Sequence, residues 1–290
     1  MAGLSDYSAQ ALLDWETGRK PMPAIGNRFL ALFTTAPTSD AGTGGTEVSG
    51  GSYARVQIAG AVAATASWTT ATPNITMTTN PGWVVPGMNV YDNTGSVQIG
   101  TVSTYVGTAL VLTGNAAANS TGSTDSLIFS AFPASSASSG AEPATLPANV
   151  TNGAVITFAA STGSWGTVTA FGVYDAVSSG NLILWDYLGN FKWLPFTCTS
   201  ASPGVLTCTA HGFSNADPVV VTAKDGGVLP TTGGSWSGAL TVAGVTTDTF
   251  TAGVNTTGTG DGLVRKIVQQ PIPSSSTFSF AASALIVTAA

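Results

Sequence analysis

Charged side chains are scarce in this 290-residue sequence: Asp, Glu, Lys and Arg together make up 8% of it, against roughly 25% in an ordinary soluble domain. The sequence also has one His and two Cys. Enzyme sites need several titratable groups whose neighbours tune their pKa values, and a structural zinc ion takes four ligands. We therefore expect a non-enzymatic protein with no catalytic, cofactor or metal site. The single histidine, His211, precedes Gly212 and Phe213, and this context favours a turn or packing role.

Other absences narrow the class of partner. No run of 18 or more apolar residues is present, so the sequence predicts no membrane-spanning helix. The first eight residues lack a cationic segment followed by an apolar stretch, so we expect no secretory signal. The net charge of −6 disfavours nucleic acid as a partner. Because 43% of the residues are hydrophobic and charge is low, a monomer would be prone to associate, which favours burial in an oligomer or a larger particle.

One helix can be predicted, at the start of the chain. Ser5 can cap its N-terminus, and Gly18 can end it in a left-handed conformation. Its apolar residues recur at helical spacing: Leu4, Ala11, Leu12 and Trp15.

The rest of the chain has the pattern of short strands separated by turns. Glycine occurs 35 times and proline 15 times, so regular runs are short. This pattern predicts an all-β protein with a jelly-roll or β-sandwich-like framework. The expected framework strands are Arg28–Thr35, Tyr53–Ile58, Ala154–Phe158, Val168–Tyr174, Leu182–Tyr187, Thr277–Phe280 and Leu285–Thr288.

Two stretches have the composition of small β-modules inserted into this framework, at residues 67–132 and 197–266. The framework itself then comprises residues 1–66, 133–196 and 267–290. We expect neither module to have much core of its own.

Both cysteines lie in a segment with the pattern of a hairpin that turns near Pro203 and Gly204. If residues pair symmetrically about Pro203, Cys198 lies opposite Cys208. Cross-strand Cβ atoms are then about 4.5–5.5 Å apart, slightly beyond the usual disulfide range of roughly 3.5–4.5 Å. A Cys198–Cys208 disulfide and a pair of buried free thiols both stay open at this point.

The expected framework also carries a series of ordered motifs. They are LSDY at 4–7, FLALFT at 29–34, GTEVSGGSYAR at 45–55, WGTV at 165–168, FGVYD at 171–175 and FSFAA at 278–282. Together these motifs resemble a family of tailed-bacteriophage virion proteins that are often labelled tail fibre proteins. The resemblance covers the framework, about half of the chain, and most members of that family lack both inserted modules.

The resemblance implies a structural protein of the virion, made in the host bacterial cytoplasm. Our first hypothesis is a head decoration (cement) protein that binds the major capsid protein as a symmetric oligomer, with a homotrimer expected. The candidate contacts to the coat or to a sister subunit are Leu4, Leu12, Trp15, Glu47 and Tyr53.

Two alternatives stand beside that hypothesis. The family label favours a tail fibre or baseplate appendage that touches the host, in which case Trp83 or Trp236 of the modules would contact a host glycan. The lack of heptads and of a fibrous repeat disfavours it. An enzyme would need paired acids, and Asp175 and Asp186 flank one strand. The context of Asp175 before Ser178–Gly180 is more typical of a turn.

Overall fold

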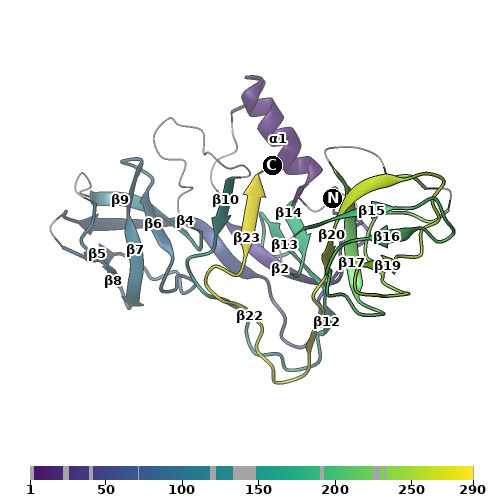
Figure 1. Ribbon diagram of the computed structural model, residues 1–290. Coiled ribbons are helices and arrows are strands. Elements are labelled where there is room, and N and C mark those ends of the chain that lie inside the picture. Colours follow the sequence, from purple (N-terminus) through teal and green to yellow (C-terminus); the bar gives the residue numbers. More distant parts are fainter. Residues whose placement is uncertain are drawn as a thin grey trace.

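The computed structural model describes residues 3–21, 26–38, 42–70, 72–117, 122–132, 148–189, 193–224, 229–231 and 233–289. Within these ranges one α-helix, α1 (Asp6–Glu16), is followed by short antiparallel strands. Two barrels of strands lie on either side of a central framework, and α1 projects above it (Figure 1). The prediction of an all-β protein with one N-terminal helix is confirmed. No helix among the described residues is long and apolar enough to cross a bilayer.

The framework is built around one antiparallel sheet. Its strands follow one another in the order β1 (Gly3–Leu4), β14 (Leu182–Tyr187), β13 (Ala170–Tyr174), β2 (Arg28–Thr35) and β4 (Val56–Trp68), and β3 (Thr46–Glu47) also pairs with β2. Three short ribbons complete the framework: β10 (Ala148–Thr151) with β23 (Ile286–Ala289), β11 (Ile156–Thr157) with β22 (Ser279–Phe280), and β12 (Gly166–Val168) with β21 (Gln270–Ile272).

Strand β4 belongs to the framework sheet and to the first barrel at once. The other strands of that barrel are β5 (Asn74–Met77), β6 (Asn89–Asp92), β7 (Val97–Val106), β8 (Ala109–Leu112) and β9 (Gly122–Ser130). Because β4 pairs with both β5 and β9, the six strands close on themselves. β4 is much longer than the strand expected at 53–58, and it passes without a break through the predicted boundary between residues 66 and 67.

The second barrel also has six strands. They are β15 (Leu194–Cys198), β16 (Val205–Thr207), β17 (Pro218–Ala223), β18 (Leu240–Thr241), β19 (Thr249–Thr251) and β20 (Gly260–Lys266). Their order in the sheet is β18-β17-β20-β15-β16-β19. The two ends of this sheet meet where Ala243 and Thr251 exchange backbone hydrogen bonds of 2.9 and 2.8 Å. The bridge closes this ring as well.

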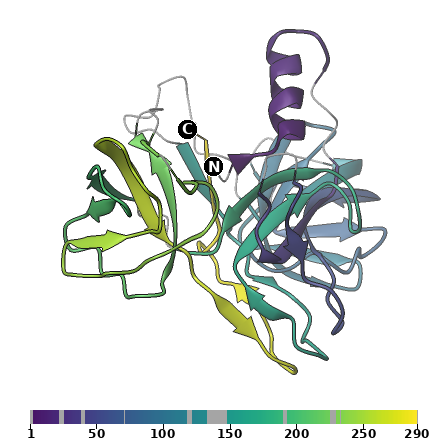
Figure 2. The same cartoon turned by 90° about the vertical axis from the view of Figure 1, so that its right-hand side faces the viewer.

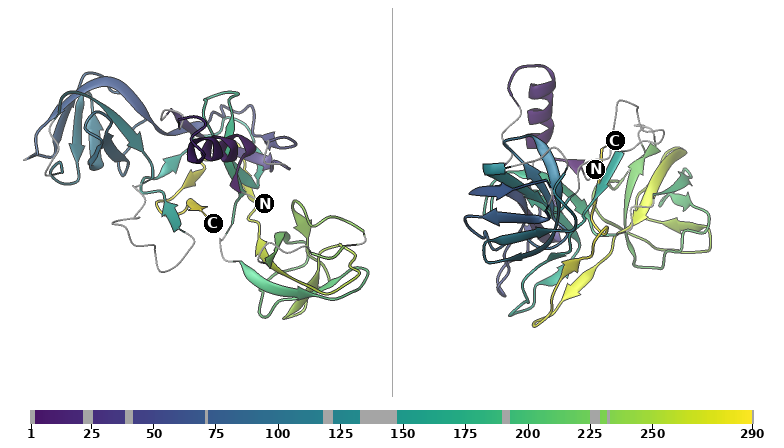
Figure 3. Two further views of the ribbon diagram at one scale, coloured as in Figure 1. Left: turned by 90° about the horizontal axis from the view of Figure 1, so that it is seen from above. Right: turned by 90° about the vertical axis from the view of Figure 1, so that its left-hand side faces the viewer.

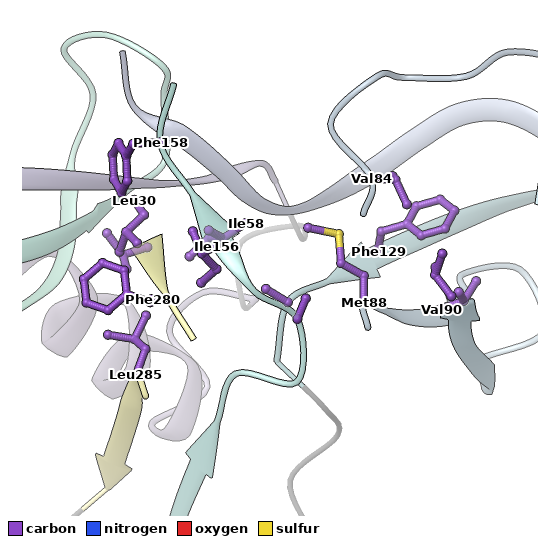
Figure 4. Close-up of a cluster of buried hydrophobic side chains, with 14 of the residues drawn as sticks. Leu30, Ile58, Val84, Met88, Val90, Phe129, Ile156, Phe158, Phe280 and Leu285 are labelled. Carbon is purple, nitrogen blue, oxygen red and sulfur yellow. The ribbon is translucent and has the colours of Figure 1, made fainter. Parts of the chain in front are cut away.

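The main hydrophobic core runs from the framework into the first barrel. In Figure 4, Ile58 and Ile156 lie between Leu30, Phe158, Phe280 and Leu285 on one side and Met88, Phe129, Val84 and Val90 on the other. The second barrel encloses a separate core, which includes Phe196, Leu206, Val219, Val221, Phe250 and Val264. The expectation that neither module has much core of its own is wrong for the second barrel, since its closed ring encloses this separate cluster.

Strand β2 is covered on both faces. Leu30 and Leu32 point into the main core. Ala31 and Phe33 point to the opposite side, into a third cluster. That cluster also contains Val220 of β17 and Ile267, the residue that follows β20. Successive side chains of a strand alternate between faces, so the unbroken apolar run of β2 meets a different part of the molecule on each side.

The main core makes a direct prediction about stability. Phe129 is fully buried where the framework meets the first barrel, and a Phe→Ala change at such a site costs about 3–5 kcal/mol. We expect Phe129→Ala to lower the free energy of unfolding by that amount in urea titrations. Val106→Ala is the control, because Val106 is 76% exposed and its loss should change stability by less than about 0.5 kcal/mol. Equal effects of the two changes would contradict the assigned core.

Candidate contact surface

The N-terminal helix is anchored to the framework at its first residue. The backbone N–H of Ser5 donates to the carbonyl of Ile183 at 2.9 Å, and its hydroxyl donates to the carbonyl of Leu182. The same hydroxyl oxygen accepts from the N–H of Ser8 at 3.3 Å, so the predicted N-cap is confirmed. Gly18 follows the helix with φ +70°, the left-handed conformation that was expected. Leu4 was expected on the helix, but it lies in β1 opposite Leu184, because an N-cap residue has extended backbone and so do the residues before it.

Beyond this anchor, the helix exposes apolar side chains. No residue of α1 is buried. Tyr7, Leu13 and Trp15 are 42%, 62% and 50% exposed, and Leu12 is half-buried. Tyr7, Ala11 and Trp15 are four residues apart, so their side chains line one face of the helix. Figure 2 shows α1 standing clear of the strands. We call Tyr7, Ala11, Leu12 and Trp15 the helix surface, whereas Leu13 lies on the opposite side of the helix.

The end of the helix is held by polar contacts. Arg19 donates from Nε and Nη2 to the two carboxylate oxygens of Asp14, at 2.6 and 2.7 Å. The backbone N–H groups of Arg19 and Lys20 both donate to the carbonyl of Asp14. The hydrogen bond from Arg19 lowers the pKa of Asp14. Exposed ion pairs contribute little stability, so these contacts set the direction of the chain rather than the strength of the fold.

Glu47 and Tyr53 do not belong to the helix surface. Arg55 donates from Nε and Nη2 to both carboxylate oxygens of Glu47, at 2.8 and 2.7 Å. Tyr53 donates its hydroxyl proton to Glu47 at 3.1 Å and accepts the backbone N–H of Leu32 at 2.8 Å. The polar atoms of both candidates therefore have partners within the framework, and their role as contacts to another subunit stays a prediction.

Arg55 explains this arrangement. Its side chain is only 7% exposed, and a buried guanidinium needs a carboxylate and hydrogen-bond acceptors. Besides Glu47, it donates to the carbonyls of Ala176 and Ser179, at 2.9 and 2.7 Å, and it lies 3.5 Å from the centre of the Tyr174 ring. Arg55 thus ties three segments of the framework together. No local pattern in the sequence singles it out, because its partners are up to 124 positions away.

The cysteines are free thiols, both buried. The hairpin register differs from the expected one by two residues, since Cys198 pairs with Leu206 and Thr197 with Thr207. The Thr199 N–H donates to the Val205 carbonyl at 3.0 Å, which centres the turn on Ser202 rather than on Pro203. Burial raises the pKa of both thiols.

The other residues discussed above are used in packing and in turns. His211 is buried against Phe213 and Phe250. Trp83 packs edge-on against Phe129, and Trp236 lies over Phe196 and donates to the Pro230 carbonyl.

The two acids that flank β14 have separate partners. Asp175 accepts the backbone and side-chain N–H groups of Asn181 at 2.7 and 2.8 Å, which is the turn role. Asp186 pairs with Arg265 of the second barrel. Among the described residues, no three His, Cys, Asp or Glu side chains are placed to hold a metal ion.

Residues 3–194 of the chain are similar to a known protein family. A family model described as Podophage GP4 fiber I protein gp80 matches the chain at residues 3–135 and at residues 102–194. These overlapping segments include α1, the main strands of the framework sheet and the first barrel, and together they cover more than half of the chain. The class of protein is therefore a bacteriophage structural protein of the fibre type. The chain belongs to the podophage fibre I protein family. No curated protein and no solved structure matches it.

Tyr53 provides a test of the internal network. Burial raises its pKa well above the ordinary value, and the Glu47 carboxylate acts in the same direction. In the unfolded chain a tyrosine ionises near pH 10, whereas folded Tyr53 keeps its proton. The contribution of Tyr53 to the free energy of unfolding is thus fully present below about pH 10, and it is lost as the pH rises above that value.

We expect Tyr53→Phe to cost about 1–3 kcal/mol at neutral pH, because the Leu32 N–H loses its acceptor. The variant should also lose less stability than the natural protein between pH 8 and pH 11, as measured by urea unfolding. Tyr7→Phe, at an exposed position, is the control and should change neither quantity. If Tyr53→Phe loses as much stability between pH 8 and pH 11 as the natural protein, the Tyr53 hydroxyl does not titrate as described.

Proposed function

We propose that this chain is a fibre subunit on the tail side of a bacteriophage virion, where it contacts other tail proteins and the host surface. The observation that carries the proposal is the match to a fibre family over residues 3–194. Of our two phage hypotheses, this match favours the tail appendage over the head decoration protein. The major capsid protein is accordingly not the partner that we propose.

The proposed role is contact rather than catalysis. The match is to a structural protein family. Asp14, Glu47, Asp175 and Asp186 each have a cation or an amide as partner. We therefore assign these carboxylates to hydrogen bonds and ion pairs within the fold rather than to contacts with a substrate.

We further propose that the helix surface attaches the subunit to its neighbours. Its exposed side chains include a Tyr and a Trp, the residue types that most often anchor protein interfaces. An isolated helix of 11 residues is marginal in water, so burial of this face would stabilise the helix and the assembly together. Leu12 and Trp15 keep their role as candidate contacts, joined by Tyr7. Leu4 would take part through strand β1, at the end of the sheet order. A homotrimer stays our proposal for the assembly.

Copy number distinguishes the two virion positions. A tail fibre subunit should be present in tens of copies or fewer per particle, whereas a decoration protein that covers the head should be present in hundreds. We expect quantitative mass spectrometry of purified virions, with the major capsid protein as internal standard, to give the lower number. Hundreds of copies per virion would overturn the tail-side proposal.

The helix surface can be tested by substitution. We expect Tyr7→Gln combined with Trp15→Gln to reduce incorporation into virions by at least about tenfold, because each anchor side chain contributes more than about 1 kcal/mol to an interface. Gln is a good helix former, so the free energy of unfolding should change by less than about 0.5 kcal/mol. Gln10→Ala, an exposed position of the same helix, serves as the control. Normal incorporation of the double variant would remove α1 from the attachment site.

A further inference from the structure

The two barrels have the same strand topology. When the strands of each barrel are numbered 1 to 6 in chain order, neighbours round both rings follow 1-2-5-4-3-6. The first ring is β4-β5-β8-β7-β6-β9, and the second is β15-β16-β19-β18-β17-β20. Figure 3 shows the two rings at opposite ends of the molecule, joined through the framework.

The pairing register agrees as well. Ile75 pairs with Leu110 in the first barrel, and Leu206 pairs with Phe250 in the second, on strands 2 and 5 of each ring. All four side chains are fully buried. Between strands 1 and 2, Ser67 pairs with Thr76, and Thr197 pairs with Thr207. A register shift of one residue would turn every side chain to the other face, so agreement at two separate pairs is a strong constraint.

The junction of strands 1 and 6 has a matching detail. Trp68 lies opposite Gly122, and Cys198 lies opposite Gly260. A Cβ at Gly122 would come within 2.1 Å of the Trp68 ring, so the absence of a side chain there makes room for the indole. The backbone N–H of the residue that follows Thr76 or Thr207 is used in the same way, since Met77 donates to the carbonyl of Thr108 at 2.9 Å and Cys208 donates to the carbonyl of Asp248 at 2.8 Å.

The sequence keeps traces of the same relation. Ala-Thr-Pro at 71–73 is followed by Gly-Trp at 82–83, and Ala-Ser-Pro at 201–203 is followed by Gly-Phe at 212–213. The spacing between the two motifs is the same in both cases, although the second barrel has one more residue between the proline and the strand-2 residue that pairs with strand 5, Pro203 to Leu206 against Pro73 to Ile75. The two barrels are therefore equivalent units, and features that they share at one place on the surface can be compared directly.

Each barrel has a shallow hollow on its outer face over strands 1, 2 and 6. The hollow of the first barrel has a volume of about 370 Å³ and is lined by Ser67, Thr76 and Ser123, with Thr69, Thr72 and Asn74 beside them. The hollow of the second has a volume of about 190 Å³ and is lined by Thr197, Thr207 and Asp261, with Thr209 and Lys224.

Three of the lining positions are equivalent in the two barrels. Ser67 and Thr76 correspond to Thr197 and Thr207 by strand pairing. Ser123 and Asp261 each follow the glycine that faces strand 1. All of these side chains are exposed, so their oxygen atoms are available to a ligand.

We infer that the two barrels are two copies of one binding unit, and that each hollow takes a sugar residue of a cell-surface glycan. Hydroxyl and amide groups at strand spacing can exchange hydrogen bonds with the hydroxyl groups of a sugar. The volumes lie at or below the lower end of ordinary ligand sites, about 300–1,000 Å³, which suits one sugar residue of a longer chain. A closed ring has no free strand edge, which disfavours an added peptide strand. The first hollow has no charged lining residue, whereas Lys224 and Asp261 suit the second to a charged sugar.

This inference rests on the proposed function, because it names what the fibre would contact on the host. It also moves the binding site away from Trp83 and Trp236, which pack inward. Two equivalently placed sites on one chain would bind a glycan that carries a neutral and a charged sugar at matching spacing with an avidity well above that of either hollow.

The test uses the full chain on an array of bacterial lipopolysaccharide O-chains and capsular polysaccharides. We expect binding to at least one glycan. Thr76→Trp and Thr207→Trp fill the two hollows at exposed positions and should each weaken that binding by at least about tenfold, with no binding left in the double variant. Thr104→Trp and Thr241→Trp, at exposed positions of β7 and β18, are the matched controls and should bind normally.

Binding to no glycan on the array would overturn the inference, and so would equal binding by hollow-filling and control variants. Binding of an extended peptide instead, lost in the hollow-filling variants, would also overturn it. A low copy number per virion without glycan binding would leave the proposed function standing and remove only this inference. Glycan binding together with hundreds of copies per virion would remove the tail-side proposal and leave the two glycan sites standing.

Discussion

The burial of β2 on both faces is the constraint on which the rest of the structure depends. Leu30 and Leu32 join the core that continues into the first barrel, while Ala31 and Phe33 join the cluster shared with the second. Full burial of a large apolar side chain stabilises a fold by about 1.5–3 kcal/mol. The same four-residue stretch thus holds both barrels against the framework. A polar residue on either face would weaken the packing of one barrel against the framework.

The second barrel is also held by a charge pair. Arg265, which is 3% exposed, lies against Asp186 of β14 and packs 4.9 Å from the centre of the Trp193 ring. Burial raises the pKa of Asp186, although Arg265 beside it acts in the opposite direction. Buried ion pairs contribute little net stability but leave a costly unpaired charge when one partner is removed. The pair therefore selects one orientation of the barrel over others. A fixed orientation is what simultaneous use of two equivalent hollows requires.

Local features of the fold could be predicted from the sequence, and distant pairings could not. The Ser5 cap, the Gly18 end and the strand at 28–35 follow from signals within a few residues. Ring closure depends on β4 meeting β9 and β15 meeting β20, across more than 50 residues, and no periodicity reveals those partners. The predicted hairpin register was wrong for a similar reason. Thr256, which lies outside the hairpin, donates to the Thr199 carbonyl and helps to hold the turn of the hairpin. The internal hydrogen bonds of Glu47 and Tyr53 could not be predicted, because no sequence pattern marks Arg55 and Leu32 as their partners.

We propose that the framework, through the anchor of Ser5 on β14, presents α1 for contact with other virion proteins. Hydrogen exchange tests it most directly, because it reports protection residue by residue. In the dilute protein, the amides of β2 should exchange slowest and those of α1 among the fastest. In purified virions, the amides of α1 should become protected while those of β2 stay unchanged. Equal exchange of α1 in the free and assembled states would contradict the account.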